Sequence, residues 1–90
     1  PAARLEDEVA RTVRRALAEE GGSALVFLPG AAEIRRTAEL LAATVKDPAV
    51  DIVPLFGALD RAEQDRAIEP AAPGRRKVVL ATSIAETSLT

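Results

Sequence analysis

The sequence contains no cysteine, methionine, histidine, tryptophan or tyrosine, and only two phenylalanines. The absence of cysteine excludes disulfides and a thiol nucleophile, and the absence of histidine excludes an imidazole base and a His/Cys metal site. No apolar run approaches the roughly 18 residues of a membrane-spanning helix, and the start lacks a signal-peptide pattern. We therefore expect no membrane segment. A chain without cysteine is compatible with the reducing cytoplasm, where we expect this protein.

The residues that are present describe a small globular unit. Of its 90 residues, 48% are hydrophobic and 29% are charged, which is neither a disordered nor a repetitive composition. The net charge of −2 means that any contact with nucleic acid must be local. No cluster of Asp and Glu has the spacing of a known metal-binding loop, so we predict no metal site. Because the chain starts at Pro1 without methionine and ends inside a helical pattern at Thr90, we expect it to be a piece of a longer protein.

Helical and strand patterns alternate along the chain. Apolar residues at helical spacing predict helices over residues 4–20 and 31–45, and a capping-box pattern at Asp60 and Glu63 begins a third, which runs to about Ile68. The pair Gly21 and Gly22 is expected to stop the first helix. Helices of this kind, placed between strands, favour an α/β protein.

Three short apolar runs predict the strands, at residues 23–28, 51–55 and 75–80. The first is apolar without interruption, so we expect it to be buried. Pro54 cannot donate to a ladder and should lie at a strand end or on an outer strand. The order of elements predicts a parallel sheet with right-handed crossovers and helices on its faces. The basic residues Arg75, Arg76 and Lys77 begin the third strand, far from the expected ligand edge, and we interpret them as solvated.

Two segments follow strands directly and are candidate ligand sites. In an open parallel sheet, ligands bind at the carboxyl ends of the strands, where free N–H groups of the next helix attract anions. Gly30 follows the first strand, and the third strand leads into Thr82 and Ser83, within a stretch in which five of the last nine residues are Ser or Thr. The simpler alternatives are a tight turn at Gly30 and an ordinary N-cap at Thr82 and Ser83.

Three segments resemble one protein family. ATSIAETSLT, residues 81–90, resembles motif V of the DEAH-box helicases of superfamily 2, and VVLATSIAETSLT is most similar to their bacterial HrpB-type branch. LVFLPGAAEI resembles motif IV, and PLFGALDRAEQDRAI is similar to the segment between the two. The family more often has Asn at the position of Ser83 and Thr at the position of Pro29. The resemblance covers roughly residues 5–90.

The resemblance implies a fold and an activity. The fold would be a three-layer RecA-like parallel sheet with flanking helices, with residues 1–90 forming the first half of the second, C-terminal RecA-like domain. The parent protein would be an ATP-dependent RNA or DNA helicase that holds ATP and Mg²⁺ between two RecA-like domains and single-stranded nucleic acid across them. Its implied partners are therefore the nucleic acid and the first RecA-like domain of the same chain.

The resemblance also implies roles for individual residues. Thr82 and Thr90 would contact nucleic-acid phosphates, and Gly30 would offer a backbone contact to the same strand. Ser88 would face the interdomain cleft and sense the nucleotide state without acting as a nucleophile. The other members of motif V receive no firm role; they are Ser83, Glu86 and Thr87.

Equally informative are the motifs that the sequence lacks. It has neither a GxxxxGK[ST] phosphate loop nor an Asp-Glu-x-His segment, so we expect these residues alone to bind no ATP or Mg²⁺ and to be inactive. We also expect an uncovered apolar face that promotes association. The alternative function is a non-catalytic α/β interaction or regulatory module. A receiver-type domain needs Asp at a strand end, where this chain has Pro29, Phe56 and Thr82.

Overall fold

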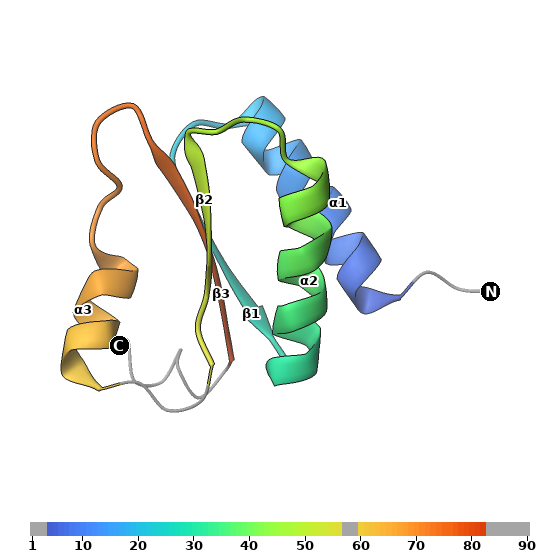
Figure 1. Cartoon of the computed structure of the whole chain (residues 1–90). Coiled ribbons are helices and arrows are strands. Elements are labelled where there is room, and N and C mark those ends of the chain that lie inside the picture. The colour runs from blue at the N-terminus through green and yellow to red at the C-terminus, as the bar shows by residue number, and fades with distance from the viewer. Residues whose placement is uncertain (1–3, 57–59, 83–90) are drawn as a thin grey trace.

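The computed structural model describes residues 4–56 and 60–82, in which helices and strands alternate as the sequence predicts (Figure 1). The first helix ends just before Gly21, and Gly22 has a φ of 82°, a left-handed conformation that glycine adopts without strain. None of the helices in this part of the chain is long and apolar enough to cross a membrane. The elements are α1 (Leu5–Glu19), β1 (Ala24–Leu28), α2 (Ala31–Thr44), β2 (Val50–Pro54), α3 (Arg61–Ile68) and β3 (Arg76–Thr82).

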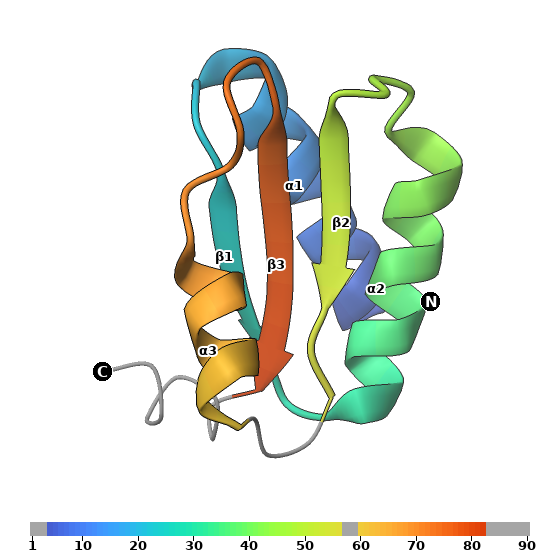
Figure 2. The ribbon, with the colours of Figure 1, turned by 60° about the vertical axis from the view of Figure 1, so that its left-hand side comes forward.

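The three strands form a parallel sheet in the order β1-β3-β2. The last strand in sequence therefore lies in the middle, where it pairs with both others. Helices α1 and α2 cover one face of the sheet and α3 lies on the other, which gives the three layers expected of the α/β class (Figures 1 and 2). Pro54 is the last residue of β2, an outer strand among those described, so the prediction for this proline is confirmed.

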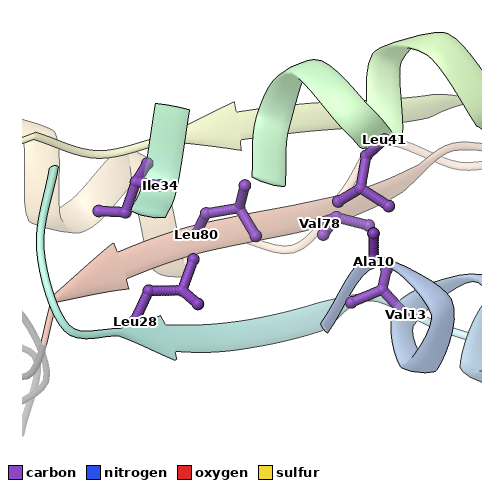
Figure 3. Packing of buried hydrophobic residues seen from close by; sticks show 7 residues of the cluster. All are labelled: Ala10, Val13, Leu28, Ile34, Leu41, Val78 and Leu80. Carbon is purple, nitrogen blue, oxygen red and sulfur yellow. The ribbon is translucent and has the colours of Figure 1, made fainter. Parts of the chain in front are cut away.

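The core lies between the sheet and the α1–α2 layer. Ile34 and Leu41 from α2 meet Val78 and Leu80 from β3, and all four side chains are fully buried (Figure 3). Burying such side chains is the main stabilising term of a small domain. The central strand is therefore fixed in the sheet by its packing as well as by its two ladders. The remaining buried members of this cluster are Ala10, Val13 and Leu28.

The prediction that the first strand is buried is wrong for the residues that face the α3 side. Leu25 is 50% exposed and Phe27 is 38% exposed, although Leu28 is only 3% exposed. In the described part of the chain β1 is an outer strand, and two of its side chains on the α3 face stay largely exposed although α3 lies on that face of the sheet (Figure 2). This exposure agrees with the expectation of an uncovered apolar face, and the association expected from it stays a prediction.

The interpretation of the basic residues 75–77 as solvated is right for Arg75, which is exposed, and wrong for the other two, which cap helices. Arg76 donates to the carbonyls of Leu17, Glu20 and Gly22, at the end of α1, over 2.6 to 2.8 Å. Lys77 extends to the other face of the sheet, where its Nζ donates to two carbonyls at the end of α3. Cations stabilise the C-terminal ends of helices, where free carbonyls and the helix dipole carry negative charge.

Arg75 instead holds the start of β2. Its guanidinium donates to both carboxylate oxygens of Asp51, at 2.7 and 3.1 Å, and to the carbonyl of Pro48. The hydrogen bond and the charge of Arg75 hold the pKa of the Asp51 carboxyl below its usual range. The stabilisation from this pair is thus present above the ordinary pKa of an aspartate and is lost as the pH falls through the lowered one.

One buried side chain is left without a hydrogen-bond partner. Thr37 in α2 is fully buried, and its Oγ1 has no donor or acceptor in the described structure. We expect Thr37→Val to raise the free energy of unfolding by about 1 kcal/mol, since it replaces an unpaired hydroxyl with a methyl group of similar size. Urea-induced unfolding measures the change. Thr12→Val, on the exposed face of α1, is the control and should be nearly neutral; a loss of stability in Thr37→Val would contradict the prediction.

Candidate functional site

The candidate site lies at the edge of the sheet where β1 and β3 end. The two strands are parallel, and their register places Leu28 opposite Thr82. Helix α2 begins just after β1, so its first turn lies at the same edge (Figure 1). The backbone therefore brings Gly30 and Thr82, which are 52 positions apart in sequence, to one side of the molecule. This is the arrangement in which α/β proteins bind anionic ligands.

Thr82 is positioned by β3, the most buried of the three described strands. The residues before it, Val78 to Ala81, are at most 3% exposed, and both ladders fix their register. The amide of Leu55, the residue after β2, donates to the carbonyl of Leu80. This hydrogen bond continues the pairing of β2 with β3 toward the carboxyl edge of the sheet. Thr82 is half-buried, so its position depends on the core and not on a loose loop.

Gly30 is the N-cap residue of α2 and contributes no capping side chain. Its φ of −168° and ψ of −176° are extended and open to any residue, so backbone strain does not require glycine here. A Cβ at this position would lie 3.1 Å from Oε1 of Glu33, the end of a flexible side chain that can shift by the little that is needed, so space does not require glycine either. The backbone contact to a ligand that the resemblance to motif IV implies at Gly30 stays a prediction.

Two of the predicted site residues lie in the described part of the chain. Among the described residues, Gly30 and Thr82 are brought to the same edge, and no group of three His, Cys, Asp or Glu side chains gathers into a metal site. The remaining motif V predictions lie outside the described residues; they concern Ser83, Glu86, Thr87, Ser88 and Thr90.

Sequence reasoning missed Glu33 as a member of this site. Its carboxylate turns back from the first turn of α2 and lies beside Gly30. A signal was available, because Glu33 stands three positions after its N-cap, as Glu63 does in the capping box of α3. The basic residues 75–77 lie at the opposite end of β3, as predicted, and do not belong to the site.

Comparison with known proteins finds one family over nearly the whole chain. The family model described as the helicase conserved C-terminal domain matches residues 5–90. The ATP-dependent RNA helicase HrpB of Escherichia coli is 51% identical over 87 residues, which cover 97% of this chain and 11% of HrpB. The pre-mRNA-splicing factor prp22 of Schizosaccharomyces pombe, an ATP-dependent RNA helicase, is 48% identical over 79 residues, which cover 82% of this chain and 7% of that protein.

The fold has a counterpart among solved structures. The crystal structure of the Escherichia coli DEAH/RHA helicase HrpB matches with a TM-score of 0.84 and 52% sequence identity. The match covers 100% of this chain and 12% of that one. The chain thus spans about a tenth, or less, of the length of these relatives.

Proposed function

The chain belongs to the helicase conserved C-terminal domain family, and from this premise we propose that it is the first half of the second RecA-like domain of an ATP-dependent nucleic-acid helicase. The observation that carries the proposal is that Gly30 and Thr82 lie at the same edge of the sheet. Both are members of motifs that resemble those of DEAH-box helicases. Relatives named as ATP-dependent RNA helicases, from a bacterium and a yeast, support the proposal.

In the proposed mechanism, this edge grips single-stranded nucleic acid by its phosphates. The hydroxyl or amide of Thr82 donates to one phosphate, and the backbone near Gly30 contacts the same strand. Thr90 is assigned a further phosphate contact by resemblance alone. Contacts of this kind position a strand without reading its bases, so we expect little sequence specificity.

Motif V would couple nucleic-acid binding at this edge to the state of the bound nucleotide. Ser88 is proposed to face the cleft toward the first RecA-like domain and to respond to the state of the bound nucleotide. Ser83, Glu86 and Thr87 remain motif members without an assigned role. Because Thr82 ends a strand anchored in the core, a displacement of motif V by the nucleotide would reach the nucleic-acid contact over a short distance.

The residues of this chain do not themselves fit ATP and Mg²⁺. The sequence has no phosphate loop, and the described residues gather no cluster of three acidic side chains, so we derive no catalytic step on this chain. We propose that ATP and Mg²⁺ are held by the first RecA-like domain of the parent protein. The proposal also places the parent in the cytoplasm, with which the absence of cysteine is compatible.

ATP hydrolysis tests the proposal in two samples. The parent protein should hydrolyse ATP faster when single-stranded RNA or DNA is added, and parallel reactions with each nucleic acid identify the substrate. The 90-residue chain alone should show no hydrolysis above a mock preparation. Hydrolysis by the isolated chain would contradict its assignment to the second RecA-like domain, which is proposed to hold no ATP by itself.

A further inference from the structure

The first turn of α2 differs from that of α3 in how its backbone N–H groups are capped. In α3, the Asp60 side chain accepts from the amide of Glu63 at 2.8 Å, and Glu63 Oε1 accepts from the amide of Asp60 at 3.2 Å. Helix α2 has a glutamate at the corresponding position, Glu33, but glycine at the N-cap. It therefore has half of a capping box, and no side chain accepts from its first-turn amides within the described structure.

The carboxylate of Glu33 nevertheless lies at this open end. Its Oε1 is 3.1 Å from the position that a Cβ on Gly30 would occupy, and the side chain is half-buried. In residues 4–56 and 60–82 it makes no hydrogen bond or ion pair, unlike Glu63. The positive end of the helix dipole attracts a negative group to this place. The same attraction would act on a phosphate.

We propose that Glu33 is an intramolecular competitor of the nucleic-acid phosphate at Gly30 and weakens the grip of this edge on a single strand. The proposal rests on the proposed function, because it presumes that nucleic acid contacts Gly30. A phosphate that approaches the first turn of α2 meets the Glu33 carboxylate and must displace it or tolerate its charge. A phosphate would therefore bind more weakly here than at a helix N-terminus without a nearby carboxylate, and it would dissociate more readily.

Binding of single-stranded RNA to the parent protein tests this role. Glu33→Gln keeps the length and shape of the side chain and removes its charge. We expect the Kd for a labelled homopolymeric RNA, measured by fluorescence anisotropy at low salt, to fall about fivefold, because one repulsive charge beside a phosphate is removed. The gain should shrink as salt is added, since screening already weakens the repulsion in the wild-type protein.

Glu39→Gln is the matched control. Glu39 is exposed on the same helix, about 9 Å further from the N-terminus along the axis, so the variant changes the net charge equally without touching Gly30. Its effect on the Kd should be much smaller. An equal fall in the Kd of both variants would show that only the net charge of the protein matters, which would overturn the specific role of Glu33. An unchanged or raised Kd in Glu33→Gln would also overturn the proposal.

The same experiment separates this inference from the proposed function. Thr82→Ala, measured in parallel, reports on the phosphate contact itself. If wild-type protein binds RNA and Thr82→Ala weakens binding while Glu33→Gln has no effect, only the role of Glu33 is wrong. If the parent protein binds no single-stranded nucleic acid, the proposed function and this inference are both wrong.

Discussion

Replacement of Arg76 by alanine is expected to lower the free energy of unfolding by about 2 to 3 kcal/mol. The guanidinium donates to the carbonyls of Leu17, Glu20 and Gly22 at 2.8, 2.7 and 2.6 Å. The last turn of α1 has no basic residue of its own, so Arg76 supplies the cation that its free carbonyls lack. Without it, these carbonyls depend on water, and α1 loses its hydrogen-bonded link to the central strand, although the packing of Ala10 and Val13 remains.

Two variants control for charge and for exposure. Arg76→Lys keeps the charge but cannot contact three carbonyls with one ammonium group, so it should recover part of the loss. Arg75→Ala removes a neighbouring arginine whose bridge to Asp51 is exposed, and it should cost much less. Urea-induced unfolding of the domain that contains this chain measures all three, and a loss in Arg75→Ala equal to that in Arg76→Ala would contradict the capping account.

The second large effect is expected on nucleic-acid binding. Thr82→Val keeps the β-branched shape that the end of β3 accommodates and replaces the hydroxyl with a methyl group. If that hydroxyl donates to a phosphate, the Kd of the parent protein for single-stranded RNA should rise about tenfold, the usual effect of losing a hydrogen bond to a charged group.

The control for this prediction is Thr82→Ser, which retains the donor and should bind RNA nearly as well as the wild type. Both variants should leave the folded structure intact, because the preceding buried residues carry the packing of β3. Anisotropy titrations together with a thermal melt separate loss of binding from loss of fold. A Thr82→Val variant that binds like the wild type would remove the hydroxyl from the proposed contact and leave only the backbone.

The local elements could be predicted from the sequence because each depends on nearby residues. The capping box at Asp60 and Glu63 depends on residues three positions apart, and the place of Pro54 depends on its own missing N–H. The edge shared by Gly30 and Thr82 could be predicted as well, because parallel strands bring their carboxyl ends together.

Features that depend on distant parts of the chain could not be predicted. The carbonyls that Arg76 contacts lie 54 to 59 positions away, and the basic run at the start of β3 alone favours a solvated segment. The exposure of Leu25 and Phe27 depends on which strands and helices cover β1, which its apolar run does not reveal. The roles assigned to Ser83, Glu86, Thr87, Ser88 and Thr90 stay predictions.

The coupling of nucleic acid to ATP is tested most directly by hydrolysis rates of the parent protein with and without single-stranded RNA, for wild type, Thr82→Ala and Ser88→Ala. We predict that RNA stimulates the wild type, that Thr82→Ala weakens this stimulation, and that Ser88→Ala lowers turnover at saturating RNA. A parent protein that hydrolyses no ATP, or variants that both behave as wild type, would contradict the assignment of this edge and of motif V as the coupling element.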